Sequence, residues 1–249
     1  MKKGILMLAL VTMAAASQAQ VQITTWWFNA DAAGNPNGND SSATTGTLTP
    51  IVGSGTAATF GGTTSTFATG RQNAAALADP TSVTSPTNNS GFNLTTFPAQ
   101  GAGSGTRGAQ FNVSTAGFYG IKVLWDHRTS NTASRWYRFD YTTDGINWNL
   151  GTATELTAGG DNWNDNRMVD LSSNVLVDNT ANFAFRIVSV FAPGGNAYAP
   201  ANATSNYATS GTWRLDSVRV VGQPVPEPAT MIGLGAAAAM LAARRRRKA

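Results

Sequence analysis

The chain has 249 residues, of which only 12% are charged, and it contains one histidine and no cysteine. The lack of cysteine excludes disulfides, thiolate metal sites and a cysteine nucleophile, and the single histidine, His127, excludes a histidine-rich metal cluster. The formal net charge of +4 comes from the two ends, because residues 20–223 carry ten basic and twelve acidic side chains. We therefore expect no nucleic-acid partner, since a nucleic-acid-binding body needs a basic surface.

Residues 1–19 have the order of charge, apolar run and small residues that is typical of a secretory signal peptide. Lys2 and Lys3 precede the apolar run, and Ser17 and Ala19 are the small residues at positions −3 and −1 of a cleavage site before Gln20. We expect the secretion translocon to export the chain and signal peptidase to cut it between Ala19 and Gln20.

The body, residues 20–222, shows no sustained helical periodicity. Short segments rich in β-branched and aromatic residues are separated by Gly, Asn and Pro, a pattern that predicts strands. The predicted strands are 21–28, 48–52, 57–60, 92–97, 109–113, 119–126, 136–143, 147–150, 167–170, 183–191 and 213–221. Many short strands without helices predict an all-β, jelly-roll-like β-sandwich.

The first part of this body, residues 20–89, is rich in Gly, Ser, Thr and Asn. Residues 29–47 and 61–89 within it are almost wholly small or polar. Because such a composition buries little apolar surface, we expect long loops and an irregular N-terminal part there.

The clearest local pattern is the segment 136–148. Tyr137, Phe139 and Tyr141 alternate with polar residues, which predicts a strand with one aromatic face. Asp144 and Gly145 then provide a tight turn, because glycine accepts the positive φ that a hairpin turn requires. We expect the chain to reverse there and the apolar segment 183–191 to supply a partner strand.

Residues 90–222 resemble a jelly-roll module that recurs in secreted bacterial proteins. The similarity lies in segments 111–117, 125–135, 141–145 and 211–218. The resemblance implies a β-sandwich, and its likeness to carbohydrate-binding β-sandwiches is a likeness of fold alone.

Asp126, His127 and Arg128 are the most reactive-looking triplet in the chain. Adjacent residues of a strand point to opposite faces, so Asp126 and His127 do not form a catalytic pair. An ion pair of Asp126 with Arg128 or Arg135 is the preferred interpretation. A hydrolase using Ser130 and His127 would need an oriented acid and an oxyanion hole, and no nucleophile-elbow motif indicates either. We expect that the protein has no enzymatic activity.

Carboxylates in the C-terminal half of the body could hold a structural calcium ion. Asp161 and Asp165 lie in a run of the oxygen ligands that calcium prefers, and Asp216 lies on the last predicted strand, where some carbohydrate-binding jelly rolls place a calcium ligand. The run lacks the spacing of an EF-hand loop, and Asp and Asn also form turns. Both interpretations stay open, and no other cofactor is expected.

Four tryptophans near strand ends or loops are candidates for stacking on sugar rings. Trp148 and Trp163 have Asn or Asp neighbours and are the predicted ligand-binding residues, and Trp26 and Trp27 are weaker candidates. The alternative is a core position, which is usual for tryptophan in a β-protein.

The C-terminal segment, residues 223–249, has three ordered features. Val225, Pro226, Glu227 and Pro228 come first, an uncharged run of 15 residues follows, and the chain closes with a basic cluster that includes Arg244, Arg245, Arg246 and Arg247. As a helix the run spans roughly 22 Å, short for a hydrocarbon core of about 30 Å. Because basic clusters stay on the cytoplasmic side, we expect the helix in the inner membrane and the body outside.

This segment resembles the PEP-CTERM sorting signal of Gram-negative bacteria. The resemblance implies recognition by exosortase, a membrane cysteine transpeptidase, with cleavage near the Pro-Glu-Pro motif and delivery to the cell surface or an exopolysaccharide matrix. A permanent membrane anchor is the alternative.

The sequence therefore predicts an exported, non-catalytic surface or exopolysaccharide-matrix protein that contacts glycans. A secreted hydrolase and an inert structural surface protein are the alternatives.

Overall fold

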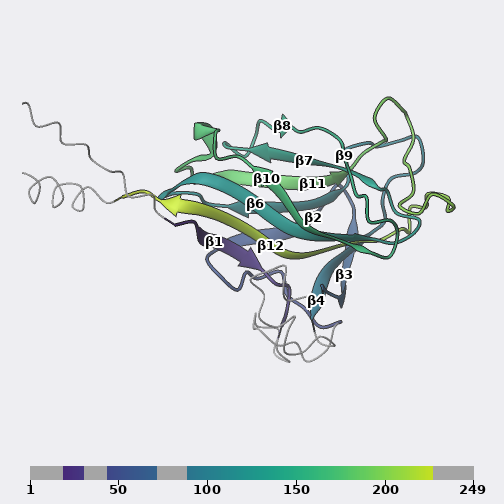
Figure 1. Cartoon of the computed structure of the whole chain (residues 1–249), viewed down its shortest axis with the longest axis horizontal. Coiled ribbons are helices and arrows are strands. Elements are labelled where there is room, and N and C mark those ends of the chain that lie inside the picture. Colours follow the sequence, from purple (N-terminus) through teal and green to yellow (C-terminus); the bar gives the residue numbers. More distant parts are fainter. Residues whose placement is uncertain (1–18, 31–43, 72–88, 227–249) are drawn as a thin grey trace, which may run out of the picture.

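Two antiparallel sheets, each of six strands, form the body of the protein in this computed structural model, which describes residues 19–30, 44–71 and 89–226. The strands run along the long axis of the molecule (Figure 1). This architecture confirms the all-β, jelly-roll-like β-sandwich predicted from the strand pattern.

The first sheet, here called the β12 sheet, has the order β10-β6-β12-β4-β3, with β1 also paired to β12. Its strands are β1 (Val21–Trp26), β3 (Thr64–Thr69), β4 (Ser90–Thr95), β6 (Phe118–Thr129), β10 (Trp163–Asp170) and β12 (Trp213–Pro224).

The second sheet, the β11 sheet, has the order β2-β5-β11-β7-β8, with β9 also paired to β7. Its strands are β2 (Gly55–Phe60), β5 (Gly108–Val113), β7 (Trp136–Thr142), β8 (Asn149–Leu150), β9 (Thr154–Glu155) and β11 (Phe183–Ser189). A 3-10 turn, Val175–Val177, precedes β11.

The core between the sheets is aromatic. The ring of Phe185 on β11 stacks on Phe111 of β5 at 4.8 Å between centroids and on Phe139 of β7 at 5.3 Å. Trp125, from β6 of the opposite sheet, stacks on Phe139 at 5.9 Å. All four side chains are buried. Burial of aromatic surface therefore holds the two sheets together.

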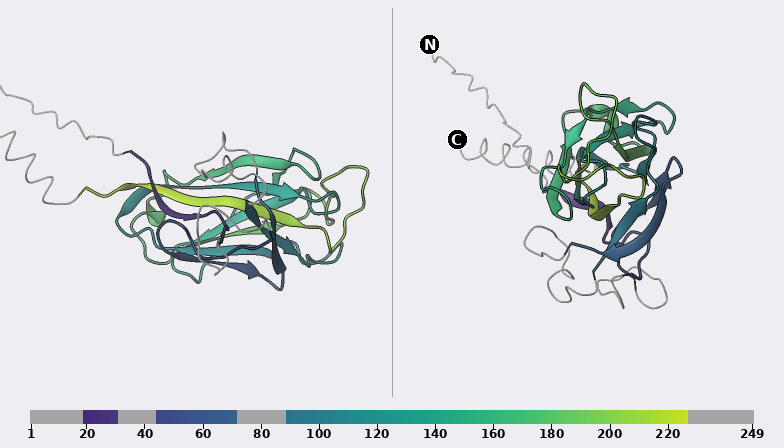
Figure 2. Two further views of the ribbon diagram at one scale, coloured as in Figure 1. Left: turned by 90° about the horizontal axis from the view of Figure 1, so that it is seen from below. Right: turned by 90° about the vertical axis from the view of Figure 1, so that its right-hand side faces the viewer.

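One edge of β12 is shared by two strands. Residues Trp213–Leu215 pair with β4, and the stretch from Val218 to Gly222 pairs with β1. Val21, at the start of β1, is the partner of Gly222, near the end of β12. Among the described strands, the first therefore begins, and the last ends, at the same end of the sandwich (Figures 1 and 2).

The predicted chain reversal at Asp144 and Gly145 is confirmed, but it runs through a six-residue loop, 143–148, and not through a tight turn. Asp140 and Tyr141 of β7 pair with Leu150 and Asn149 of β8, and Gly145 has a φ of 77°. The predicted partner strand is also present, because β11 pairs with β7 over six residue pairs.

The predicted strand 48–52 is wrong. Only an isolated bridge between Thr25 and Val52 forms in this region. Pro50 lacks an N–H group and cannot donate to a ladder at this position.

The expectation of loops throughout 61–89 is wrong for β3, which pairs along all six residues with β4. β3 is an edge strand with mostly exposed side chains, so it carries no apolar alternation and its Thr and Phe content was the only signal. β9 is a further short strand that the sequence pattern does not predict, and both β6 and β10 are longer than expected.

The predicted signal peptide up to residue 18 and the predicted C-terminal helix lie outside the described residues. Within residues 19–30, 44–71 and 89–226 there is no helix with the length and apolar character needed to cross a membrane.

Candidate functional site

The outer face of the β11 sheet presents an ordered set of polar and aromatic side chains. Phe111, Phe139, Phe185 and Ile187 point into the core. Since successive side chains of a strand point to opposite faces, their neighbours Gln110, Asn112, Ala184 and Arg186 point outward. The strand pairing places the outward residues of β2, β5, β11 and β7 in three rows across the sheet. The first row is Thr56, Asn112, Ala184 and Thr142, and the second is Ala58, Gln110, Arg186 and Asp140. The third row is Phe60, Gly108, Val188 and Arg138.

Arg186 occupies the middle of this face, on the central strand β11. Its guanidinium carbon lies 3.9 Å from the ring centroid of Phe60 on β2 and 3.4 Å from that of Trp148 in the β7–β8 turn. Its Nε donates a hydrogen bond of 2.7 Å to Oε1 of Gln110. Two cation–π contacts and one hydrogen bond thus hold the guanidinium on the outer face of the sheet, between the rings of Phe60 and Trp148.

A row of amide groups continues from Arg186 toward β2. Gln110 Nε2 donates to Asn112 Oδ1 at 3.0 Å, and Asn112 Nδ2 donates to Thr56 Oγ1 at 2.7 Å. Each polar group of the row is oriented by its neighbour, so the face keeps a defined pattern of donors and acceptors.

The acid nearest to Arg186 on this face is already bound. Asp140 accepts two hydrogen bonds from Arg138, from Nε at 2.6 Å and from a terminal nitrogen at 2.9 Å, and a third from the N–H of Gly151 at 3.2 Å. Burial lowers the pKa of Arg186 and the nearby charge of Asp140 opposes this shift. Arg186 stays protonated, because arginine does not lose its proton in proteins.

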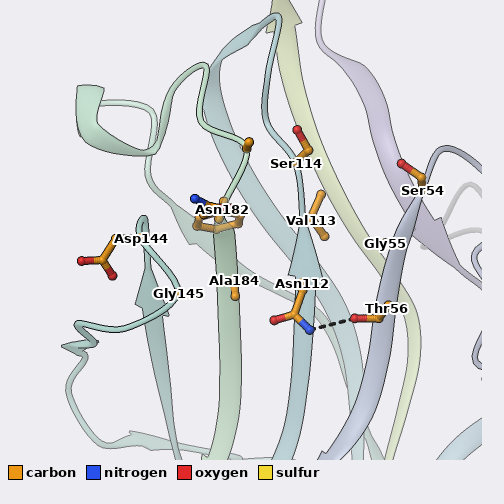
Figure 3. A pocket seen from close by; sticks show the side chains of 12 residues that line it. Ser54, Gly55, Thr56, Asn112, Val113, Ser114, Asp144, Gly145, Asn182 and Ala184 are labelled. Atoms are coloured by element: carbon orange, nitrogen blue, oxygen red, sulfur yellow. Dashed lines mark hydrogen bonds between the residues drawn. The ribbon is translucent and has the colours of Figure 1, made fainter.

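A hollow of about 350 Å³ lies at one end of the same face (Figure 3). Thr56, Asn112 and Ala184 form its floor, and Ser114 and Asn182 lie at its rim. Its volume falls in the range of about 300–1,000 Å³ that is usual for small-molecule sites. Asn112, which lines the hollow, accepts a hydrogen bond from Gln110, and Gln110 accepts one from Arg186, so the hollow and Arg186 adjoin on this face.

Asp144 lines this hollow from the β7–β8 turn. Its carboxylate accepts hydrogen bonds from Asn147 Nδ2, from the N–H groups of Ile146 and Asn147, and from Thr142 Oγ1, and these bonds hold the pKa of Asp144 well below its usual range. The carboxylate is thus charged at neutral pH, and the turn that it caps satisfies it.

The structure separates the predicted sugar-stacking tryptophans. Trp148 lies on the outer face of the β11 sheet, half-buried beside Arg186, whereas Trp163 is a half-buried residue of β10 in the other sheet. Trp26 is fully buried and contacts Phe111, so it is a core residue and not a sugar-stacking residue. Trp27 is half-buried at the end of β1.

The three predicted calcium ligands have protein partners. Asp161 is paired with Arg128 at 2.7 Å, Asp165 accepts two hydrogen bonds from Arg71, and Asp216 accepts one from the N–H of Arg71. The described residues include no group of three acidic or histidine side chains arranged to hold a metal ion. Arg71 thus brings a positive charge next to Asp165 and Asp216. Calcium binding stays a prediction.

Asp126 lies on the outer side of β6, opposite Asp216 of β12. It is buried, and one of its oxygens accepts a hydrogen bond from the N–H of Asn166 at 2.8 Å. Burial, aided by the charge of Asp165 and opposed by the Asn166 hydrogen bond and by Arg71, raises the pKa of Asp126 to about 7.

The predicted ion pair of Asp126 with Arg128 or Arg135 is wrong. Arg128 pairs with Asp161, and Arg135 pairs with Glu155 at 3.2 Å. The strand β6 continues through Arg128 to Thr129, so the side chain of Arg128 extends along the sheet toward the loop of Asp161.

His127 points inward from β6 and is fully buried. Its ring lies 4.6 Å from that of Trp213 and 5.7 Å from that of Tyr137, and neither ring nitrogen has a hydrogen-bond partner among the described residues. Burial, together with the charge of Arg167, lowers the pKa of His127 to about 3. The geometry offers no pairing of this imidazole with Ser130, which the hydrolase interpretation requires.

The predicted processing residues lie near the same end of the sandwich. Ala19 and Gln20 are exposed just before β1. Val225, which is 46% exposed, follows β12 and donates its N–H to the carbonyl of Gly117 at 2.8 Å, and Pro226 is the last described residue. Glu227, Pro228 and Arg244 to Arg247 lie outside the described residues.

Sequence reasoning missed Arg186, Phe60, Gln110 and Asn112. The alternation of Phe183, Phe185 and Ile187 with polar or small residues indicated that Arg186 faces outward, but no sequence signal linked it to Phe60, which is 126 positions earlier in the numbering.

A comparison with protein-family models matches residues 224–247 to the PEP-CTERM protein-sorting motif. The resemblance of the C-terminal segment is thereby confirmed, and the chain carries the sorting signal of an exported protein. A comparison with curated proteins gives no match.

A comparison with solved structures finds carbohydrate-binding modules. The CBM22-1 xylan-binding domain of Xyn10C from Paenibacillus barcinonensis shares 10% identity, with a TM-score of 0.44, over 85% of this chain and 100% of that chain. TmCBM61 in complex with beta-1,4-galactotriose shares 7%, with a TM-score of 0.35, over 68% and 88%. The CBM22-1-GH10 modules of Clostridium thermocellum Xyn10B, complexed with xylohexaose, share 10%, with a TM-score of 0.37, over 68% and 27%. At these values the likenesses carry no conclusion about what this chain binds.

Proposed function

We propose that this chain is an exported, non-catalytic surface protein whose β-sandwich binds a polysaccharide on the outer face of the β11 sheet. Its PEP-CTERM signal would make it an exosortase substrate of a Gram-negative bacterium. Signal peptidase and the secretion translocon would act first, the inner membrane would hold the precursor, and the product would reach the cell surface or the exopolysaccharide matrix.

The observation that carries the binding proposal is the continuity of the hollow with the Arg186 stack. A sugar chain needs donors and acceptors for its hydroxyl groups and apolar rings for its C–H faces. The amides of Gln110, Asn112 and Asn182 provide the first, and the rings of Phe60 and Trp148 provide the second. Small-molecule sites commonly combine such apolar walls with a few oriented polar groups.

The non-catalytic part of the proposal is supported by the state of the reactive groups. His127 is enclosed in the core without a polar partner among the described residues. On the candidate face, Asp140 is bound by Arg138 and Asp144 by its own turn. A general acid or base must instead reach the substrate with a proton to exchange.

The test is affinity electrophoresis of the full-length chain, purified in mild detergent, in gels that contain neutral or acidic polysaccharides. We expect at least one polymer to retard the wild type and Trp148→Ala to reduce the retardation about tenfold, the order expected for loss of one stacking contact of 1–1.5 kcal/mol. Asn112→Leu, which fills the hollow, should reduce it as well.

Trp163→Ala is the matched control, because Trp163 lies in the other sheet. It should leave the retardation unchanged. Free migration of the wild type with every polymer would overturn the proposal, and so would an equal loss in the Trp148 and Trp163 variants.

A further inference from the structure

We infer that the polysaccharide bound by this face is acidic and that the guanidinium of Arg186 binds the carboxylates of its uronate units. This inference rests on the proposed function and narrows its ligand class.

Arg186 is held in place before any ligand arrives. Phe60 lies two strands away on one side of β11, and Trp148 lies on the β7–β8 side. Together with the hydrogen bond from Nε to Gln110, they fix the plane of the guanidinium. A long side chain that is already ordered loses little conformational entropy when it binds a ligand.

No acidic side chain among the described residues pairs with the guanidinium of Arg186. Among the described residues, none accepts a hydrogen bond from its two terminal nitrogens. Asp140, the nearest acid, is bound in two places by Arg138 and once by Gly151. Arg138 and Asp140 neutralise each other, so Arg186 leaves the middle of the face with one positive charge.

The planar shape of the Arg186 guanidinium suits a carboxylate ligand. A guanidinium presents parallel N–H groups that match the two oxygens of a carboxylate. On Arg186, Nε is bound to Gln110, and the terminal nitrogens remain for such a group. Uronic acids are the common carboxylate-bearing sugars, and their rings provide C–H faces for Phe60 and Trp148.

The acid at the other end of the face sets a limit on the ligand. Asp144, charged at neutral pH, lines the hollow, and the floor residue Ala184 is two positions before Arg186 on β11. A carboxylate is thus favoured over Arg186 and disfavoured inside the hollow. A polymer of acidic and neutral units fits this pattern.

The experiment compares one polymer in two chemical forms. The full-length chain is run in gels containing a polyuronate, the same polymer after reduction of its carboxyl groups, or a sulfated neutral glucan. We expect retardation by the polyuronate, at least tenfold weaker retardation by the reduced polymer, and loss of the polyuronate effect as NaCl rises from 50 to 500 mM, because salt screens exposed charges.

Variants of Arg186 test whether this residue is responsible for the binding of the polyuronate. Arg186→Gln should weaken polyuronate binding roughly 10- to 100-fold, as loss of a charged hydrogen-bonded contact does, and should weaken binding of the reduced polymer much less. The polyuronate affinity of Arg186→Lys should lie between those of the wild type and Arg186→Gln, because lysine keeps the charge and lacks the planar guanidinium. Arg214→Gln, on the outer side of the other sheet, is the matched control. Thermal melting of each variant verifies that it is folded.

The outcomes separate this inference from the proposed function. Equal binding of both polymer forms, or unchanged polyuronate binding by Arg186→Gln, overturns the acidic-ligand inference while polysaccharide binding stands. Binding of the sulfated glucan without the polyuronate overturns the carboxylate assignment. Binding of no polymer at all overturns both.

Discussion

Asp126 and His127 are consecutive residues of β6 that point to opposite faces of the β12 sheet, and both are fully buried. Burial moves their pKa values in opposite directions, to about 7 for Asp126 and to about 3 for His127. Each residue is thereby held in its neutral form near pH 5, one with its proton and the other without.

The two residues should give opposite dependences of stability on pH. Between about pH 3 and 6.5 the unfolded chain protonates His127 and the folded chain does not, so this contribution to stability is lost as pH falls. Between about pH 4 and 7 the folded chain keeps the Asp126 proton that the unfolded chain releases, so this contribution is lost as pH rises. In the shared window the two slopes, each up to about 1.4 kcal/mol per pH unit, oppose each other.

Single variants should reveal each slope. Asp126→Asn should make the free energy of unfolding rise with pH between 4 and 6, and His127→Phe should make it fall. Urea unfolding of the full-length chain, followed by tryptophan fluorescence at several pH values, measures both. Parallel pH profiles for the wild type and the two variants would contradict the assignment.

Arg71 should stabilise the fold by neutralising acids of the β12 sheet. Its side chain binds Asp165, and its N–H binds Asp216, near the buried Asp126. We expect Arg71→Ala to cost about 1–3 kcal/mol, the usual range for leaving a partly buried charge without its partner, and Arg71→Lys to cost less.

The same variants test the predicted calcium site. Melting temperatures are compared in EDTA and in calcium chloride. With Arg71 present we expect little change, and with Arg71→Ala we expect calcium to restore part of the loss. A clear rise of the wild-type melting temperature with calcium would instead support a site that includes Asp161, Asp165 or Asp216.

Two glycines should differ sharply in their tolerance of alanine. A Cβ on Gly108 would lie 2.0 Å from the carbonyl oxygen of Ile187, inside the paired ladder of β5 and β11. Gly145 has a φ of 77° but open space around it. We expect Gly108→Ala to lower the free energy of unfolding by more than about 3 kcal/mol, as overpacking at its upper range does, and Gly145→Ala by about 1 kcal/mol from backbone strain. Similar costs for both would contradict the close approach of β5 and β11.

Replacement of Pro226, Glu227 and Pro228 by alanine should block processing of the exported chain. We expect the variant to remain in the membrane fraction at its uncut mass, and Gln223→Ala, just upstream, to behave as the wild type. Immunoblots of membrane and extracellular fractions measure this. Normal release of the triple variant would show that the motif does not direct cleavage.

The sequence pattern predicts most of the strands because their side chains alternate between core and solvent. It fails for β3, which is exposed at a sheet edge and has no buried face to impose alternation. It also fails at 48–52, where β-branched residues suggested a strand and Pro50 removes a donor.

The candidate site was only partly accessible from the sequence. Trp148 was predicted from its turn and its Asn neighbours. Its contact with Arg186 depends on the pairing of β7 with β11, and the contact of Arg186 with Phe60 depends on β5 lying between β2 and β11. Such non-local register follows from the topology of the whole sandwich, which short-range patterns do not encode.

Because Val21 pairs with Gly222, the same end of the sandwich leads to both termini of the chain and would lie next to the membrane in the precursor. Pro226 is followed within three residues by the uncharged segment 229–243, so at most about 11 Å of extended chain separates them. While that segment is held in the lipid, the end of the sandwich with Val21 and Gly222 should stay next to the membrane, and the β6–β7 connection lies at the opposite end. The Arg186 surface lies on the side of the sandwich, between these two ends, where polymers close to the envelope could reach it.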